Sequence, residues 1–527
     1  MEVKNMGLTR EAYQELANIV GPEYITEEPA VLDGYCFIWG NEVIFGDKFS
    51  TRPLAVIMPG SVEEVQAIVK VCNKHRIRYK AHASGWETVA LTAREPFLPM
   101  DLRRMNRILE IDEKNKYAVV EPYVSTRELM IETFSKGLRC HFAGCGPSAS
   151  AIASSAGHFG SGASNISTDY GGRTPLGVEW VLPDGEILRL GSLGTGAGWF
   201  SGDGPGPSLR GVMRGYGGAN GAMGVMTKVA IKLYPWYGPD WVEAKGSPPG
   251  YEIVVPKNFK TYTIGFPSRE SQGEFLNVLM EEAVAHAAQR GSAGFHFNMI
   301  YDSMDELAMY MQSTPPEELQ KLWFCSSVVL DASSSREMHY REKCLEKLLE
   351  KTGGYIYPFP DKGLGAVFHN CITGQGGNRA FRASGSFVIS PVGEESWDTM
   401  QLMGKRAAEE LHAKYEQAGQ IVTQGEGGPW GVCYGDTCGH LEQIVTFDPA
   451  DPNACKAVGE LVEQCDKKVA EWRIGINLLE GALSFEEASI NAAAPYCLDF
   501  PSLMRKIKKA FDPNLVAESS FYVTPRE

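Results

Sequence analysis

Four loops rich in glycine and serine are the part of this sequence best suited to do chemistry. They are residues 84–86 (SGW), 143–148 (AGCGPS), 154–162 (SSAGHFGSG) and 217–224 (GGANGAMG). The backbone N–H groups of such loops can surround a pyrophosphate without help from positively charged side chains. Ordinary surface turns are the alternative, but four such loops within about 140 residues are more than turns account for. We therefore expect these loops to bind a pyrophosphate.

Several common catalytic and cofactor motifs are missing from the chain. No G-x-G-x-x-G follows a strand and opens a helix, and Walker A, HExxH and GxSxG patterns are also absent. The 12 cysteines include no CxxC pair, which argues against an iron–sulfur cluster and against a disulfide framework. Reduced thiols of this kind are typical of a cytoplasmic protein.

The elements that must position the loops alternate between strands and helices. A short apolar strand at Leu54–Met58 precedes Ser61-Val62-Glu63-Glu64, a capping box that opens an amphipathic helix. The apolar face of this helix consists of Val62, Val65, Ile68, Val69 and Cys72. The other expected elements are strands at Ile77–Ala81, Ile108–Ile111, Tyr117–Glu121 and Gly224–Leu233, a helix at Thr126–Phe134 and a hairpin over Val178–Leu190.

The second half of the chain has the pattern of an antiparallel sheet covered by helices, an α+β arrangement. Its expected strands are Tyr262–Phe266, Phe387–Ser390 and Ile444–Phe447, and its expected helices are Glu270–Arg290, Ser335–Lys351 and Ser396–Ala418. Prolines 235, 239, 248 and 249 mark a boundary, and Phe500–Phe511 is an amphipathic helix. We therefore expect a cofactor domain at 1–240, a cap at 241–464, and a C-terminal segment at 465–527 that returns to the first domain.

Length and charge narrow the class of protein further. A chain of 527 residues exceeds what one hydrophobic core usually organises. Its formal charge of −15 disfavours nucleic acid and anionic lipid as partners. No apolar run reaches the length of about 18 residues that a membrane span needs, and the first ten residues have no apolar core of a secretory signal. The sequence therefore predicts a cytoplasmic protein with no membrane span.

Five segments together resemble the vanillyl-alcohol oxidase / p-cresol methylhydroxylase family of flavoproteins. They are residues 52–77, 100–122, 177–191, 206–235 and 507–514, and they occur in family order. The cap resembles the family less, although residues 384–392 (SGSFVISPV) and 470–475 (AEWRIG) fall at family landmarks. The resemblance implies a two-domain FAD-binding fold of the p-cresol methylhydroxylase type, with substrate held between the flavin ring and the cap.

The resemblance also implies which residues bind FAD. The pyrophosphate is expected on the loop that starts at His82, the flavin ring beside residues 144–162, and the adenine end near the 224–225 backbone. The implied cofactor-binding residues are His82, Ser84, Gly85, Trp86, Gly144, Gly146, Pro147, Ser148, Ser154, Ser155, Gly157, His158, Gly162, Gly224 and Val225. Ser386 stands where some members have a histidine bonded to the flavin, and Trp86 stands where another branch has one. We therefore expect the FAD to be non-covalent.

The expected catalytic residues are Trp86, Trp472, Arg473 and His158. In phenol-oxidising members, two tyrosines and an arginine hold the substrate phenolate, and here Trp86, Trp472 and Arg473 occupy those places. An indole N–H can donate a hydrogen bond but cannot accept one. An aspartate near the flavin in some members corresponds to Gly160, two residues from His158, whose imidazole suits proton abstraction near neutral pH.

Each of these residues also has an ordinary interpretation. Arg473 could form a surface ion pair, the two tryptophans could be core aromatics, and His158 could be a hydrogen-bonded loop histidine. His369 and His440 could indicate a metal site, but the metal-binding H-x-G-D-G-N-x-H and E-H-G-x-G motifs of the hydroxyacid-oxidising branch are absent. We therefore expect no metal.

The function that this pattern favours is FAD-dependent hydride removal from an aromatic substrate of the phenolic, benzylic or aryl-alcohol type. The electrons are expected to pass to a separate electron-transfer protein, and the chain is expected to form homo-oligomers. A 2-hydroxyacid dehydrogenase or an ether-lipid-synthase-like flavoenzyme is the first alternative. A non-catalytic FAD-binding subunit of a complex is the second.

Overall fold

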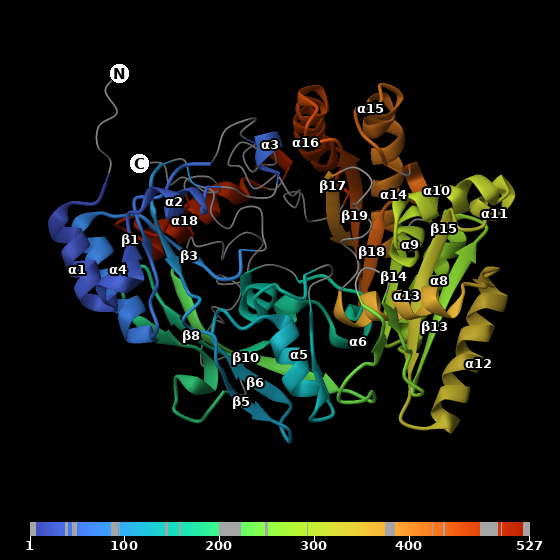
Figure 1. The fold of residues 1–527 in the computed structure, drawn as a ribbon, viewed down its shortest axis with the longest axis horizontal. Coiled ribbons are helices and arrows are strands. Elements are labelled where there is room, and N and C mark those ends of the chain that lie inside the picture. The colour runs from blue at the N-terminus through green and yellow to red at the C-terminus, as the bar shows by residue number, and fades with distance from the viewer. Residues whose placement is uncertain are drawn as a thin grey trace.

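The computed structural model forms two lobes (Figure 1). It describes residues 7–36, 40–44, 50–85, 93, 95–142, 146–157, 160–199, 223–247, 251–291, 293–374, 385–423, 425–435, 438–474, 494–496 and 498–519. The N-terminal lobe, on the left of Figure 1, contains two sheets from the first half of the chain and the C-terminal helix. The cap, on the right, contains one larger sheet and its helices.

The first sheet of the N-terminal lobe has four short strands in the order β1-β2-β4-β3. They are β1 (Ile25–Thr26), β2 (Val56–Ile57), β4 (Leu98–Asp101) and β3 (Tyr79–His82). Helices α1 (Arg10–Val20) and α4 (Val62–His75) pack on this sheet. The predicted apolar face of α4 is confirmed, since all five of its residues are buried. Ser61 caps the helix by accepting from the Glu64 N–H, while the Glu64 carboxylate accepts from the Gly60 N–H at 2.8 Å.

The second sheet of this lobe is antiparallel, in the order β5-β6-β10-β8-β9, with β7 also pairing with β10. The strands are β5 (Ile108–Asp112), β6 (Tyr117–Val120), β7 (Leu138–Cys140), β8 (Pro175–Val181), β9 (Ile187–Arg189) and β10 (Val225–Pro235). Helix α5 (Thr126–Phe134) has the predicted bounds and a complete capping box between Ser125 and Glu128. The short elements of the lobe are α2 (Pro29–Asp33), α3 (Asn41–Ile44) and α6 (Asn165–Thr168), and a two-stranded ribbon of β11 (Ala244–Lys245) and β12 (Glu252–Ile253) leads to the cap.

The cap sheet has seven antiparallel strands in the order β16-β13-β15-β14-β18-β19-β17. They are β13 (Phe259–Phe266), β14 (Ala287–Gly291), β15 (Phe324–Asp331), β16 (Tyr355–Tyr357), β17 (Ser386–Glu395), β18 (Trp430–Tyr434) and β19 (Cys438–Phe447). One face packs on α8 (Arg269–Glu282), α12 (Ser335–Thr352), α14 (Trp397–Arg406), α15 (Ala413–Gln417) and α16 (Pro452–Trp472). The other face packs on α9 (Ala293–Ile300), α13 (Asp361–Thr373) and the N-terminal lobe, and α10 (Met304–Ser313) and α11 (Pro316–Gln320) lie at its margin. The α+β fold class is therefore confirmed.

One predicted cap helix is wrong in its second half. The run Glu270–Arg290 is helical only as α8, and its last four residues belong to strand β14. Ala283 ends the helix in a left-handed conformation, with φ +49°. Ala287 and Ala288 then pair with Val329 and Val328 of β15, because a central position of the sheet accepts small side chains packed from both faces. The predicted helix Ser396–Ala418 is α14 and α15 joined by a π-helical turn at Ala407–His412.

The C-terminal segment returns to the N-terminal lobe. Helix α18 (Phe500–Phe511) has the predicted bounds, and the Phe511 ring stacks on Trp180 of β8. Beyond the helix, the Tyr79 N–H donates to the Val516 carbonyl at 2.8 Å and the Glu518 N–H donates to the Tyr79 carbonyl at 2.8 Å. The last described residues thus extend the first sheet alongside β3.

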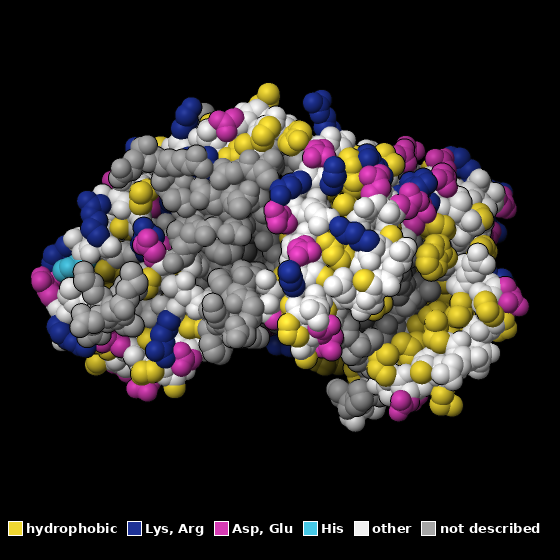
Figure 2. Space-filling view, turned by 90° about the horizontal axis from the view of Figure 1, so that it is seen from above, with side chains coloured by type: hydrophobic (Ala, Val, Ile, Leu, Met, Phe, Trp, Pro, Cys, Tyr) yellow, Lys and Arg dark blue, Asp and Glu magenta, His cyan; other side chains and the backbone are white. Residues whose placement is uncertain are grey.

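No helix in the described part of the chain is long and apolar enough to cross a membrane. On the face drawn in Figure 2, basic and acidic side chains are intermixed over the cap. The described surface on this side therefore gathers no basic patch of the kind that nucleic acid needs.

Candidate functional site

The first glycine-serine loop begins where β3 ends, and the structure places it against the segment between the second and third loops. The Ser150 N–H donates to the Ser84 Oγ at 2.9 Å. Gly85 has φ +69°, and a Cβ there would lie 2.6 Å from the His82 ring. Burial lowers the pKa of His82, and its Nδ1 is buried without a hydrogen-bond partner among the described residues. This loop therefore contains one buried nitrogen, His82 Nδ1, without a described hydrogen-bond partner, and it leaves no room for a side chain at Gly85.

The second loop lies on the first turn of α5. The Thr126 N–H donates to the Ala149 carbonyl and the Arg127 N–H donates to the Pro147 carbonyl. These two bonds attach the turn from Gly146 through Ser148 to the first residues of α5. Ser154 and Ser155 follow in a π-helical turn that ends at Gly157, and both serines are buried. π-Helical turns are rare and are frequently found at functional sites. The structure thus brings the described parts of three predicted FAD-binding stretches together.

The 160–162 segment crosses from this site toward the cap. Gly160 has φ +62°, and a Cβ there would lie 2.4 Å from the Ser154 carbonyl oxygen and 2.8 Å from the His141 Nε2. Burial lowers the pKa of His141 to about 3, so its ring is neutral at physiological pH. Gly160 therefore stands where no other residue type fits.

Replacing Gly160 by alanine is expected to cost at least about 2 kcal/mol of stability, because the new Cβ meets a carbonyl oxygen in a left-handed conformation. The same change is expected to lower the FAD content of the purified protein. Thermal unfolding and flavin absorbance of Gly160→Ala check both effects. Gly196→Ala is the matched control, since Gly196 also has positive φ but has open space around its Cβ position. Equal effects of the two substitutions would show that backbone conformation alone is responsible.

Gly224 and Val225 lie at the start of β10. Gly224 has φ +112°, and a Cβ there would lie 2.3 Å from the Val181 carbonyl oxygen. The Val225 side chain is fully buried in the core of the first sheet. Close packing of two strands accounts for this glycine, and its predicted contact with FAD stays a prediction.

The 160–168 segment makes several polar contacts between the two lobes. The Ser161 hydroxyl forms a short hydrogen bond with the Tyr434 hydroxyl of β18. The Ala288 N–H of β14 donates to the Ala163 carbonyl at 2.8 Å, and the Gly435 N–H donates to the Asn165 carbonyl at 3.1 Å. The cap strands β14 and β18 therefore lie directly on the loop expected beside the flavin ring.

The face of the cap sheet that meets this loop is polar. Its side chains include Gln289 of β14, Trp430 and Tyr434 of β18, His440 and Glu442 of β19, and Glu394 of β17. The Gln289 amide oxygen accepts from the Trp430 indole N–H and the Asn370 amide of α13, both at 3.2 Å. The rings of Trp430 and Tyr434 flank His440, with centroids 5.9 and 6.0 Å away. A buried sheet face normally packs apolar side chains, so this polar face marks a site. We call these six residues the cap polar face.

His440 is the charged centre of the cap polar face. Its Nε2 lies 2.9 Å from the Glu442 carboxylate and its Nδ1 lies 3.4 Å from the Glu394 carboxylate. Burial by itself would lower the pKa of His440, but the two carboxylates outweigh burial and raise the pKa to about 9. His440 is therefore an imidazolium at neutral pH. The two glutamates remain 14% and 19% exposed, so this charge cluster borders solvent-accessible space.

The predicted catalytic residues lie elsewhere or outside the described residues. Trp86, Gly144 and His158 are outside the described ranges. Trp472 is the last residue of α16 and packs on the helix-covered face of the cap sheet, with the Arg406 guanidinium 4.2 Å from its ring centroid. Arg473 follows in a left-handed conformation with its side chain exposed. The structure therefore does not place Trp472 on the cap polar face, and the catalytic roles of these residues stay predictions.

Ser386, at the position of a covalent histidine in some relatives, lies at the start of β17. Its hydroxyl donates to the Glu42 carboxylate of α3 at 2.8 Å. His369, one of the two histidines considered for a metal, packs edge-on against Tyr251. His440 contacts the carboxylates of Glu394 and Glu442, as described above.

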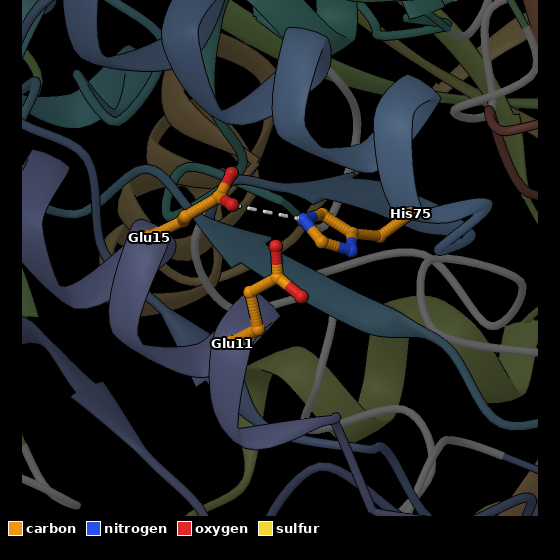
Figure 3. A group of neighbouring side chains, drawn as sticks. All are labelled: Glu11, Glu15 and His75. Carbon is orange, nitrogen blue, oxygen red and sulfur yellow. Dashed lines mark ion pairs between the residues drawn. The ribbon is translucent and has the colours of Figure 1, made fainter.

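One group of described side chains has metal-ligand spacing. Glu11, Glu15 and His75 hold their ligand atoms within 4.8 Å of one another (Figure 3). Lys74 already occupies this cluster, with its ammonium 2.5 Å from Glu15 and 3.7 Å from Glu11. These contacts are an ion-pair network that joins α1 to α4.

Sequence reasoning missed most of the cap polar face. The sequence patterns did not indicate Glu394, Tyr434 or Ser161 as site residues, and they indicated His440 only as a candidate metal ligand. The available signal was the alternation in β19, where His440 and Glu442 occupy one face of a strand between apolar neighbours. That signal is weak, because polar residues on one face also fit an ordinary solvent-exposed strand.

Comparison with known proteins agrees with the fold and the loops. Residues 53–191 match the family described as FAD binding domain. The chain is 29% identical over 239 residues to a glycolate oxidase subunit GlcD from Bacillus subtilis (strain 168), covering 43% of this chain and 46% of the relative. It is 28% identical over 251 residues to a 4-cresol dehydrogenase (hydroxylating) flavoprotein subunit from Pseudomonas putida, covering 44% and 43%. The matches thus span less than half the length of these relatives.

The fold match extends over the whole chain. The solved structure of p-cresol methylhydroxylase with substrate bound superposes with a TM-score of 0.74 at 18% identity, covering 98% of both chains. The predicted similarity to p-cresol methylhydroxylase is therefore supported. The predicted similarity to vanillyl-alcohol oxidase stays a prediction. Residues 53–191 form an FAD-binding domain, and the chain has the two-lobed fold of the p-cresol methylhydroxylase type of FAD-binding protein.

Proposed function

We propose that this protein is an FAD-dependent oxidoreductase that removes hydride from a small hydroxyl-bearing aromatic substrate. The observation that carries the proposal is the cap polar face, which lies directly on the 160–162 segment of the FAD-binding lobe. A cap without a substrate would gain stability from an apolar face at this position. When bound, FAD supplies the hydride acceptor.

The chain's own residues would bind and orient the substrate. The imidazolium of His440 offsets part of the negative charge of Glu394 and Glu442, and Trp430 supplies a flat wall beside it. A negatively charged substrate group stabilises the positive charge that develops on a carbon losing hydride. This chemistry favours a phenolate or carboxylate on an aromatic ring.

Arg473 is the second candidate for contact with this anion. Its side chain is exposed. Arg473→Ala is expected to lower kcat/KM by roughly a hundredfold if it pairs with the substrate anion, since the loss of a buried charge pair has this size. Arg473→Lys should recover only part, because lysine lacks the planar fork of arginine. Full turnover of Arg473→Ala, or joint loss of flavin and fold, would make the arginine structural.

We propose that FAD is bound without a covalent link to residues 86 or 386. Ser386 bonds to Glu42, and neither a serine nor a tryptophan forms the usual histidyl link to flavin. Acid precipitation is expected to leave all the yellow colour in the supernatant. Flavin that pellets with the protein would contradict this expectation.

A 2-hydroxyacid substrate is the second candidate function, because the chain is similar to a glycolate oxidase subunit. A non-catalytic flavin-binding subunit is the third. Anaerobic mixing of the purified yellow protein with phenols, aryl alcohols and 2-hydroxyacids separates all three. Bleaching of the flavin by aromatic compounds supports the first candidate, and bleaching only by hydroxyacids supports the second. A yellow flavin that none of these compounds bleaches supports the third.

We propose a separate redox protein as the physiological electron acceptor. The sequence contains no nicotinamide fingerprint and no cluster motif, so reoxidation falls to oxygen or to a partner. Reduced flavin is expected to react slowly with air. Rapid reoxidation with stoichiometric hydrogen peroxide would contradict this proposal.

A further inference from the structure

We propose that Ser161, Tyr434 and Glu394 form a proton relay that collects the proton of the substrate hydroxyl as the substrate is oxidised. The inference rests on the proposed function and adds to it the route by which the proton leaves. The relay begins in the FAD-binding lobe and ends in the cap, so it exists only when the two lobes are joined.

The hydrogen bonds of the relay have a single direction. The Tyr434 hydroxyl donates to the Glu394 carboxylate at 2.5 Å, because an ionised carboxylate can only accept. Tyr434 has one proton, so the Ser161 hydroxyl is the donor in its short bond to the Tyr434 oxygen. The lone pairs of Ser161 are then available to accept a proton from a substrate hydroxyl beside the 160–162 segment. Each group passes a proton toward Glu394.

The surroundings of the relay keep Tyr434 protonated and Glu394 receptive. Burial, followed by Glu394, raises the pKa of Tyr434 well above its ordinary value. The charged and titratable groups that face the relay are His440 and Glu442 of β19, with Cys438 of the same strand and Tyr170 of the N-terminal lobe nearby. The His440 ring lies 3.4 Å from the Glu394 carboxylate and 2.9 Å from the Glu442 carboxylate, so a positive charge lies beside the end of the relay.

Oxidation of the substrate hydroxyl releases one proton, and the relay accepts this proton. The substrate C–H and O–H bonds break and its C=O bond forms. The hydride, with both electrons, goes to FAD as the proposed function requires. The hydroxyl proton goes to the Ser161 Oγ, the Ser161 proton goes to the Tyr434 oxygen, and the Tyr434 proton goes to the Glu394 carboxylate.

A purely structural role explains this chain of bonds less well. Several other contacts already join the lobes at this place, including Ala288 to Ala163, Gly435 to Asn165 and Ser167 to the His286 carbonyl. None of these three contacts ends on a carboxylate. A glutamate with a buried hydroxyl donor and a neighbouring imidazolium is a costly way to hold two lobes together, but it is a suitable proton acceptor.

Flavin reduction in Tyr434→Phe tests the relay. Phenylalanine keeps the ring and removes only the hydroxyl. The probes are 4-hydroxybenzyl alcohol, benzyl alcohol and D-lactate, mixed anaerobically with the FAD-loaded full chain between pH 6.5 and 9.5. At pH 7 we expect reduction by the most effective probe to be about a hundredfold slower than in the wild type, as for loss of general-base catalysis. The deficit should shrink as pH rises, because hydroxide then increasingly replaces the relay as the base that takes the proton during oxidation. Tyr415→Phe, a buried tyrosine in the α15–α16 core, is the matched control.

A uniform loss of rate at every pH, or an unchanged rate, would overturn the relay. Titration of His440 by NMR of histidine-labelled protein gives a second readout that needs no substrate. Glu394→Gln should lower the pKa of His440, and Tyr434→Phe should also shift it, whereas Tyr415→Phe should not. If none of the three probes reduces the wild-type flavin, the proposed function is wrong for these substrates. The His440 titration is then the only test of the relay. An unshifted His440 in both variants would then overturn it.

Discussion

Asp512→Ala is expected to lower the free energy of unfolding by about 3–5 kcal/mol, the largest stability effect foreseen for a single substitution in this chain. Asp512 is fully buried where α18 meets the first sheet. Its carboxylate accepts from the Lys508 ammonium at 2.7 Å, from the Val516 N–H at 3.0 Å and from the Ala517 N–H at 2.9 Å. Alanine would remove the carboxylate partner of the buried ammonium, which keeps its 2.7 Å bond to the Ala517 carbonyl, and would leave two buried N–H groups without this acceptor.

The loss should be greatest at the C-terminal segment, because the same residues hold it beside β3. Urea unfolding of Asp512→Ala measures the change in stability, and limited proteolysis shows whether the C-terminal segment becomes cleavable. The double variant Lys508→Met, Asp512→Ala is the informative control, since it removes the unpaired charge as well. It should recover part of the lost stability. A single variant as stable as the wild type would show that water replaces Asp512 at little cost.

Stability is expected to fall by about 3 kcal/mol as pH rises from 6 to 9.5, through His440 alone. The folded-state pKa of His440 is raised from 6.5 to about 9, so the folded protein holds this proton more tightly than the unfolded chain does. Its contribution is therefore fully present below pH 6.5. It is lost as pH rises through about 9, where the folded state also releases the proton.

The pH dependence of the difference between wild type and His440→Gln isolates this contribution. The difference in unfolding free energy should be largest near pH 6 and should shrink by about 3 kcal/mol by pH 9.5. His339→Gln, the same substitution at an exposed position of α12, is the matched control. A constant difference for His440→Gln would mean that the imidazole is not held as a cation between Glu394 and Glu442.

Local patterns alone predicted much of the N-terminal lobe. Helix α5 has a capping box and helix α18 has an uninterrupted amphipathic pattern, and both were predicted with their observed bounds. The apolar face of α4 was also predicted from spacing. These features depend on neighbours within one or two turns, so the sequence carries their whole cause. Glycine at positions 85 and 160 also has a local cause, since both have positive φ and a Cβ would clash with neighbouring atoms.

Only the tertiary structure decided the rest. The residues of β14 favour a helix by composition, and pairing with β15 in the centre of the cap sheet overrides that preference. Ser161 and Tyr434 are 273 residues apart, and nothing near either residue in sequence indicates that they meet. The raised pKa of His440 likewise requires two carboxylates, one of which is on another strand. The sequence by itself determined an FAD-binding lobe and a helix-covered cap. The contact between the lobes decided which polar side chains form one site, because charge and hydrogen bonding act through space and not along the chain.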